Sequence, residues 1–259
     1  MEVAHRQGVL TAASLMVSAP AARDAVARAK ALPGLGVGLH LVLVEGRPTL
    51  SPRSIPDLVD DEGLFRTHMA RAGAAMFFQP AVRRQLAREV EAQFEAFAAT
   101  GLALDHVNAH KHFHLHPTIA GLILRIGSRF GLRSARLPIE PSAILGQIEP
   151  GSAGRDWLVD PWARLARRRF RAHRVAVPDQ VFGLRWSGAM TTPRLRGLID
   201  RLPPGLSEIY LHPASASDYP GSAPGYGYRD ELAALLDPEV GAAARKTGLS
   251  LGPFAKFAL

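Results

Sequence analysis

Short apolar runs alternate with amphipathic helical segments along almost the whole chain. Residues 10–17 and 36–43 have the pattern of buried strands. Residues 20–32, which lie between them, have the pattern of a helix that begins at a proline and ends before Pro33-Gly34. Strands that alternate with helices form parallel βαβ units. The alternation therefore predicts an α/β protein with parallel strands.

The most regular helical pattern lies at residues 80–100. Val82, Leu86, Val90, Phe94 and Phe97 recur at spacings of three and four, which places them on one face of a helix. Further strands are expected at 102–108, 134–139, 180–184, 208–211 and near 249, and further helices at 117–130, 157–173, 193–202, 229–236 and 238–247.

About seven strands are therefore expected in a chain of 259 residues, a length typical of one barrel domain. We predict a single domain over residues 1–259 with the fold of an irregular (β/α) barrel. A doubly wound open sheet is the alternative.

Composition narrows the classes of function. The chain has no cysteine, which excludes disulfides and thiolate metal sites. It has no apolar run long enough to span a bilayer, and its first residues lack the pattern of a signal peptide, so we expect a cytoplasmic protein. The net charge of +8 fits either an anionic partner or a solvated basic face. No nucleic-acid recognition module is present, which argues against a nucleic-acid binder.

The segment DHVNAHKHFHLHP, residues 105–117, holds five of the ten histidines. All five have even numbers, so on a continuing strand they would share one face. Five imidazoles side by side would be costly to desolvate. We therefore expect the strand to end near Asn108 and the chain to turn before a helix begins at Pro117.

Histidines and charged residues also follow other predicted strands. His40 ends the run GVGLHLVL, Arg136 and Glu140 flank the end of SARLPIE, and His212 follows SEIYL. In a (β/α) barrel the ends of the strands carry the functional side chains. Imidazole is a common metal ligand, and a catalytic divalent site uses about three protein ligands. His40 and His110 are candidates for two of them, although a lone histidine such as His40 also fits a satisfied core position.

Several motifs, taken in order, resemble the YdjC-like carbohydrate deacetylases. They are GVLTAASLMVSAPAARDAV, VGLHLVLVEGRP, LDHVNAHKHFHLHP, ARLPIEP and EIYLHPA, and within the family they are most similar to a hopanoid biosynthesis-associated branch. The resemblance implies a metal-dependent hydrolase that removes the acetyl group from an N-acetylated sugar. It also implies an irregular (β/α) barrel and one divalent metal ion, Mg²⁺ or Zn²⁺.

The same resemblance implies the roles of individual residues. It assigns His40 and His110 to the metal and His212 to protonation of the leaving amine. The family has an aspartate two positions before the second metal histidine, and this position is Asn108 here. We expect Arg136, Glu140, His112 and His114 to bind substrate.

The implied substrate is an N-acetylglucosamine attached to a hopanoid polyol, whose apolar end lies in a membrane. Residues 162–174 (WARLARRRFRAHR) then gain a role at the membrane surface. Their arginines would face anionic lipid, with Trp162, Leu165 and Phe170 nearer the bilayer. A solvated helix with its apolar side in the core is the alternative. The pattern predicts peripheral contact at most, and it does not predict an oligomeric state.

One family segment has no counterpart in the sequence. The family opens with a strand that ends in A-D-D-F-G, whose aspartates supply a third metal ligand and a general base. Here residues 1–5 resemble the middle of the following helix, so the first strand and both aspartates are expected to be absent. A misplaced start of translation and a truncated, inactive homologue that binds sugar or lipid are the two explanations.

Overall fold

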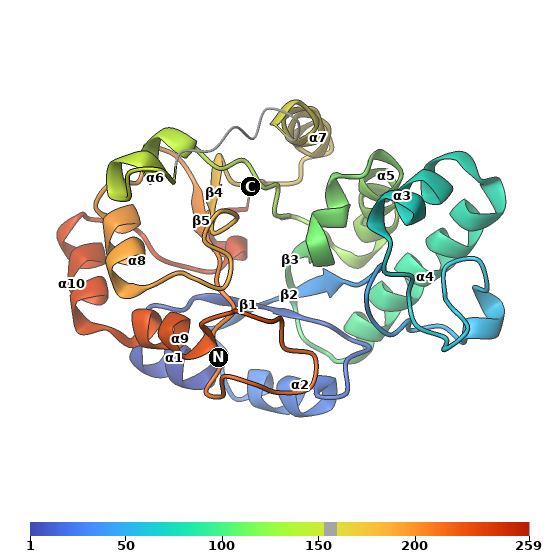
Figure 1. Cartoon of the computed structure of the whole chain (residues 1–259), viewed down its shortest axis with the longest axis horizontal. Coiled ribbons are helices and arrows are strands. Elements are labelled where there is room, and N and C mark those ends of the chain that lie inside the picture. Colours follow the sequence, from blue (N-terminus) through green and yellow to red (C-terminus); the bar gives the residue numbers. More distant parts are fainter. Residues whose placement is uncertain (153–159, 259) are drawn as a thin grey trace. The chain divides into compact units, whose positions relative to one another are not determined.

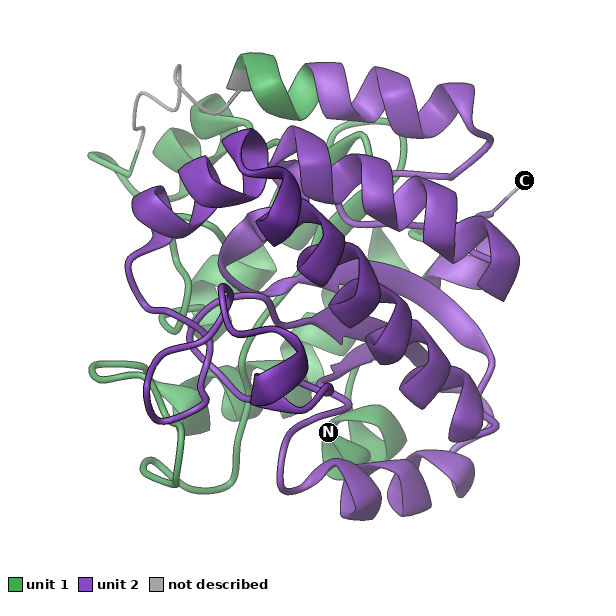
Figure 2. Cartoon of the chain, turned by 90° about the vertical axis from the view of Figure 1, so that its right-hand side faces the viewer, with its two compact units in different colours: residues 1–11, 138–164, 178–252 green, residues 12–137, 165–177, 253–259 purple. Residues whose placement is uncertain are grey.

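The structure, a computed structural model, describes residues 1–152 and 160–258, and its named strands are all parallel (Figure 1). The chain divides into two units, each assembled from separate stretches of sequence (Figure 2). Unit 1 comprises residues 1–11, 138–164 and 178–252, and unit 2 comprises residues 12–137, 165–177 and 253–259. The α/β class and the parallel strands are therefore confirmed. The closed barrel and the single domain stay predictions.

Unit 2 is built on a three-stranded sheet in the order β1-β2-β3. The strands are β1 (Ala12–Leu15), β2 (Gly36–Leu41) and β3 (Leu104–Ala109). Ser14 pairs with Gly38, and His40 pairs with Asn108. The register thus places side chains from the carboxyl half of each strand next to one another.

Helices of unit 2 connect and follow these strands. The connections hold α2 (Ala22–Lys30), α3 (Met69–Phe78), α4 (Pro80–Ala99) and the short 3-10 helix η1 (Pro52–Ser54). After β3 come η2 (His110–Leu115), α5 (Pro117–Gly127) and η3 (Ser128–Phe130), and the chain closes with η4 (Phe254–Lys256). The helix α7 (Asp160–Ala172) begins in unit 1 and continues into unit 2.

The core of unit 2 lies between the sheet and these helices. Val82, Leu86, Val90, Phe94 and Phe97 of α4 are all buried, as their spacing predicts. They pack in one apolar cluster with residues of β2, β3 and α5. At the end of α5 and η3, Gly131 takes a left-handed conformation with φ 75°, which only glycine adopts without strain.

Unit 1 contains a two-stranded parallel sheet, β4 (Gln180–Phe182) with β5 (Ser207–Ile209). Its helices are α1 (Glu2–Gln7), α6 (Ser142–Ile148), α8 (Thr192–Ile199), α9 (Tyr228–Leu236) and α10 (Pro238–Lys246). Phe182, Trp186, Leu198 and Leu235 belong to a second apolar core, separate from that of unit 2. No helix in the described ranges is both long enough and apolar enough to cross a membrane.

Three details of the sequence-based prediction are wrong. The described residues hold five named strands rather than seven, because Ser134 and Ala135 make only isolated bridges. No strand forms near Leu249, because its N–H turns back to the carbonyl of Ala244 and closes the end of α10. Helices α3 and α6 were not predicted, whereas α1 agrees with the resemblance of residues 1–5 to part of a helix. The beginning of the predicted helix at 157–173 lies outside the described residues.

Candidate active site

Two histidines follow adjacent strands of unit 2 and face each other. His40 lies near the end of β2, and His110 is the first residue after β3. Their ring centroids are 5.8 Å apart at an interplanar angle of 72°. Parallel strands end at the same edge of a sheet, so the pairing of β2 with β3 brings the two imidazoles together.

Charged groups surround His110. Glu45 places a carboxylate oxygen 4.0 Å from its Nε2 atom, and the same oxygen lies 3.2 Å from the ammonium of Lys111. Burial lowers the pKa of His110, and the charge of Lys111 adds to this, while Glu45 opposes it. His110 is therefore held as a neutral imidazole, the form that binds metal ions.

The chain turns sharply after β3, as expected for this run of histidines. Lys111 and His112 both have left-handed backbone conformations, with φ of 52° and 57°. His112 and His114 then meet edge to face, with ring centroids 5.8 Å apart. Non-glycine residues in this region are strained, and such strain gathers at functional sites.

His114 is a buried hydrogen-bond donor. Its Nδ1 atom accepts a hydrogen bond of 3.1 Å from the backbone N–H of Ala109, so its proton lies on Nε2. Burial, followed by the charges of His112, Arg136 and His40, lowers the pKa of His114 well below 6.5. The Nε2 atom is buried and has no hydrogen-bond partner among the described residues. The orphaned N–H suits a substrate oxygen and cannot ligate a metal ion in this tautomer.

Glu140 and His212 belong to unit 1. The Glu140 carboxylate is buried and accepts hydrogen bonds from the backbone N–H groups of Gly183, Leu184 and Arg185, at 2.7, 3.0 and 2.9 Å. It therefore fixes the loop that follows β4. Its role in substrate binding stays a prediction.

His212 lies three residues after the end of β5. Its ring makes edge contacts with Tyr210 and Tyr226, at centroid distances of 5.7 and 5.2 Å. Its backbone N–H donates to Glu231, a fully buried carboxylate that also accepts from Met190 at 3.1 Å. Burial raises the pKa of Glu231, while these backbone hydrogen bonds oppose the rise. Glu231 thus anchors the backbone that carries His212.

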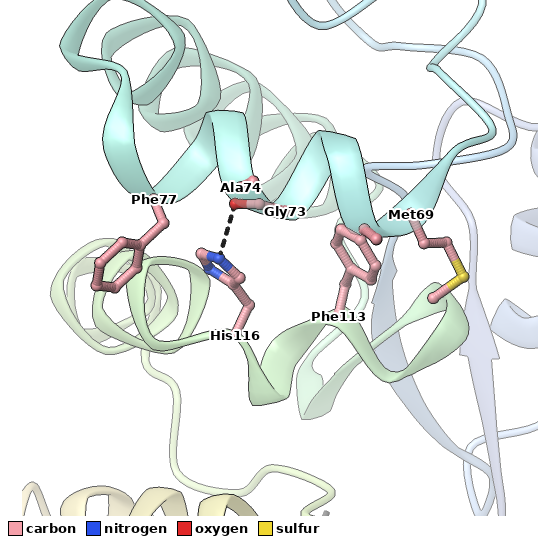
Figure 3. A pocket seen from close by; sticks show the side chains of 7 residues that line it. Met69, Gly73, Ala74, Phe77, Phe113 and His116 are labelled. Atoms are coloured by element: carbon pink, nitrogen blue, oxygen red, sulfur yellow. Dashed lines mark hydrogen bonds between the residues drawn. The ribbon is translucent and has the colours of Figure 1, made fainter.

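An apolar pocket of about 430 Å³ adjoins the histidine-bearing segment η2. Figure 3 shows Met69 and Phe77 of α3 on one side of it and Phe113 and His116 on the other. The Nε2 atom of His116 lies 3.1 Å from the carbonyl oxygen of Gly73, a hydrogen bond that ties η2 to α3. The remaining lining residues are Ala70 and Ala74.

The side chains near His40 and His110 match part of the ligand set of the divalent ion that the resemblance implies. His40 and His110 fit as two nitrogen ligands, because the rings meet edge to face with centroids 5.8 Å apart and the pKa of His110 is lowered. Within residues 1–152 and 160–258, no group of three or more His, Cys, Asp or Glu side chains is placed to hold a metal ion. The pair thus supplies part of the usual set of about three protein ligands.

Sequence reasoning missed Glu45 and Ser14. Glu45 comes five residues after His40, just past the apolar run of β2, so the rule of strand ends could have identified it. It also has a positive φ of 51°. Ser14 lies on β1 and bonds to both His106 and Asn108, a contact across 92 or more residues that no local pattern reveals.

Comparison with known proteins places the chain in a family. Residues 1–246 match the family described as YdjC-like protein. A carbohydrate deacetylase of Geobacillus stearothermophilus is 32% identical over 257 residues, which is 98% of this chain and 89% of that protein. The chain therefore belongs to the YdjC-like family.

Other relatives and one solved structure agree. Carbohydrate deacetylases of Brevibacillus brevis and Vibrio cholerae are 38% and 37% identical, over 56% and 49% of this chain and 54% and 48% of theirs. The chain thus aligns with about half the length of these two proteins. An Enterococcus faecalis crystal structure, provisionally described as a cellobiose-phosphate cleavage protein, matches with a TM-score of 0.76 at 23% identity. The match covers 100% of this chain and 92% of the Enterococcus faecalis chain, and it shows that the two proteins share a fold. The deacetylase relatives support a hydrolase that acts on an amide C–N bond.

Proposed function

We propose that the protein is a metal-dependent deacetylase that hydrolyses the N-acetyl group of an amino sugar. One observation carries the proposal. Two imidazoles, His40 and His110, meet at adjacent strand ends in a chain that is similar over 98% of its length to a carbohydrate deacetylase.

His40 and His110 would hold the divalent ion. When bound, such an ion supplies Lewis-acid polarisation of the acetyl carbonyl and lowers the pKa of a bound water. The chain's own residues bind and orient the sugar and move protons. His114 donates its buried Nε2–H to a substrate oxygen, with the positive charge of Arg136 close to that ring. His112 and Glu140 are the further substrate-binding candidates, and His212 protonates the departing amine.

The choice between Mg²⁺ and Zn²⁺ follows from the donors. Two imidazole nitrogens favour Zn²⁺ and similar transition ions, whereas Mg²⁺ prefers oxygen. Glu45 places a carboxylate oxygen 4.0 Å from Nε2 of His110. We propose one divalent ion, with Zn²⁺ as the first candidate to assay and Mg²⁺ as the second.

The proposed substrate is N-acetylglucosamine carried on a hopanoid polyol, with a free amino sugar as product. The apolar pocket beside η2 supports an apolar aglycone, because Met69, Phe77 and Phe113 line it together with His116. A cytoplasmic protein that touches the inner face of the membrane would reach such a substrate. Trp162 and Leu165 of α7 are 54% and 57% exposed and flank the exposed Arg164, which fits a contact with anionic lipid.

One part of the membrane prediction is wrong. Phe170 is fully buried in the core of unit 2, so it cannot face a bilayer. A solvated α7 with only Phe170 and its neighbours in the core is the alternative arrangement.

A second candidate function is a homologue that binds sugar or lipid without hydrolysis. The absence of a three-membered metal group from the described residues favours it. Turnover by the chain separates the two candidates.

The experiment measures acetate release from N-acetylglucosamine-containing substrates, together with bound metal, for the wild type and four variants. His40→Ala and His110→Ala should each weaken metal binding by at least about 100-fold and abolish turnover, as expected for loss of a ligand. His212→Ala should keep the metal and slow turnover. His173→Ala, at an exposed histidine whose Nδ1 bonds to the Arg169 carbonyl, is the matched control. Unchanged metal content in both ligand variants would refute the site, and metal binding without acetate release would favour the second function.

A further inference from the structure

A continuous hydrogen-bond relay crosses the three strands of the unit 2 sheet and ends at His40. The Nδ1 atom of His40 lies 2.6 Å from Oδ1 of Asn108, and Nδ2 of Asn108 lies 2.9 Å from Oγ of Ser14. Ser14 Oγ is 3.0 Å from Nε2 of His106, whose Nδ1 lies 2.9 Å from Oδ2 of Asp105. These five residues, from Asp105 to His40, are named the relay below.

Two glycines of the segment GVGLH on β2 make room for the relay. A Cβ atom at Gly38 would lie 2.5 Å from the His106 ring, and one at Gly36 would lie 2.6 Å from the Asp105 carboxylate. Both distances are closer than real Cβ atoms approach other heavy atoms. His106 on β3 therefore reaches Ser14 on β1 only because the strand between them lacks side chains at these positions.

Asp105 is held as an anion. Its oxygens accept hydrogen bonds from the backbone N–H groups of Phe254 at 3.2 Å and Ala255 at 2.8 Å. Burial raises the pKa of Asp105, but the hydrogen bonds from His106, Ala255 and Phe254 outweigh this, and the pKa is lowered. The His106 ring is buried and stacks on Phe254 at a centroid distance of 4.2 Å. The start of the relay is therefore an acceptor only.

The anion sets the direction of every bond that follows. A carboxylate only accepts, so a proton of His106 lies on Nδ1, and with one proton on the ring Nε2 is an acceptor. Ser14 must then donate its hydroxyl proton to His106, so its oxygen accepts from the Asn108 amide. This turns Oδ1 of Asn108 towards His40, whose Nδ1 becomes the donor and whose Nε2 carries the lone pair.

The amide of Asn108 must be held in one orientation by its neighbours in order to accept from His40, whereas a carboxylate would accept without being oriented. A carboxylate at that position would accept from His40 in either orientation. The side-chain amide of asparagine presents an acceptor or a donor according to how it is turned. Hydrogen-bonded partners of a metal-ligating histidine fix its tautomer and raise its basicity.

We propose that Asp105, His106 and Ser14 are positioning residues that fix the Asn108 amide and hold His40 in the tautomer with an unprotonated Nε2. This inference rests on the proposed function at one point, the binding of a divalent ion by Nε2 of His40. The tautomer itself is a property of the protein without metal or substrate.

The first test is long-range ¹H–¹⁵N NMR of the metal-free protein labelled with ¹⁵N-histidine, at pH 8. The His40 signals are assigned by their loss in His40→Gln. The wild type should show His40 with its proton on Nδ1. Ser14→Ala frees the amide to turn, and His40 should shift towards the tautomer with its proton on Nε2. Ser14→Thr keeps the hydroxyl and should restore the wild-type signal.

The matched control is Ser18→Ala, because the Ser18 hydroxyl bonds to the Arg47 carbonyl, outside the relay. It should leave the His40 signals unchanged. The proposal would be overturned if Ser14→Ala kept the wild-type tautomer of His40. It would also be overturned if His40 of the wild type carried its proton on Nε2. Ser14 is exposed, so its truncation leaves no cavity in the core.

The second test measures Zn²⁺ affinity by chelator competition, without substrate. Ser14→Ala should weaken binding by about tenfold or more, the range seen when a partner of a metal ligand is lost. The same change in an Asn108→Asp background should have little effect, since a carboxylate needs no orientation. An equal loss in both backgrounds would overturn the proposal. A wild type that binds no Zn²⁺ would contradict the proposed metal site, while the tautomer measurement would still decide the relay.

Discussion

His40 and Asn108 are register partners on β2 and β3, and Nδ1 of His40 lies 2.6 Å from Oδ1 of Asn108. This contact joins the candidate metal ligand to a polar network that runs through the middle of the sheet. The two faces of the strands thus do different jobs. Apolar residues such as Leu39, Leu41 and Val107 form the core on one face, and polar residues on the other face orient one imidazole.

Replacing the amide by a carboxylate should strengthen the site. Asn108→Asp places a charged acceptor against His40 Nδ1, which raises the basicity of the ring and should tighten Zn²⁺ binding by about tenfold. Asn108→Leu, similar in size but without an acceptor, should weaken it by at least as much. Isothermal titration of the two variants measures both effects. Tighter binding by Asn108→Leu would show that the 2.6 Å contact does not support the ligand.

Acid should destabilise the metal-free protein through its buried histidines. The folded-state pKa of His114 lies well below the 6.5 of an exposed imidazole, so between these values the unfolded chain binds a proton that the folded chain does not. The contribution of His114 to the stability of the fold is therefore complete above pH 6.5 and is lost as the pH falls. His110 and His116 are shifted in the same direction.

Urea unfolding between pH 7.5 and pH 5 measures this effect. For His114 alone, the free energy of unfolding should fall by at most about 1.4 kcal/mol per pH unit. His114→Gln should make the free energy of unfolding less dependent on pH, by up to the contribution of one bound proton. His173→Gln, at an exposed histidine, should leave this pH dependence unchanged. Equal slopes for His114→Gln and the wild type would contradict the burial argument.

Sequence patterns predicted the parts of the fold that depend on local periodicity. The helix α4 was predicted at 80–100 and observed at Pro80–Ala99, because a long apolar stripe defines both its face and its ends. The segment 134–139 was predicted as a strand, yet only Ser134 and Ala135 make bridges. An apolar run does not show how much neighbouring backbone is present to pair with it.

The candidate site was predictable where ligands follow strand ends and hidden where contacts cross the sheet. His40 and His110 stand at the ends of β2 and β3, so the order of the elements brings them together. Ser14 and His106 are 92 positions apart, and their contact depends on the missing side chain of Gly38. Only the strand register reveals that relationship.

Glu231 should be important for the stability of the His212 segment. Glu231→Gln replaces one accepting oxygen by a donor that faces a backbone N–H, either that of Met190 or that of His212. A buried unsatisfied donor costs about 1–3 kcal/mol, so the free energy of unfolding should fall by this amount. Chemical denaturation measures the change. Glu239→Gln, which removes an exposed ion pair with Arg196, should cost no more than about 1 kcal/mol, and an equal loss in both variants would argue against a special role for Glu231.

The exposed apolar residues of α7 should govern binding to anionic membranes. Trp162 and Leu165 are 54% and 57% exposed and lie three positions apart, on one side of the helix next to Arg164 and Arg168. The double variant Trp162→Ala, Leu165→Ala should lose most of its co-sedimentation with vesicles that contain anionic lipid, and Arg168→Glu should weaken it because the charge is reversed. Phe78→Ala, at the 73% exposed residue that ends α3, is the control and should bind as the wild type does.

Binding to anionic vesicles should also fall as salt rises from about 0.1 to 1 M, over which the Debye length drops from about 10 to 3 Å. A wild type that stays in the supernatant at low salt would exclude the membrane contact and leave α7 as a solvated helix.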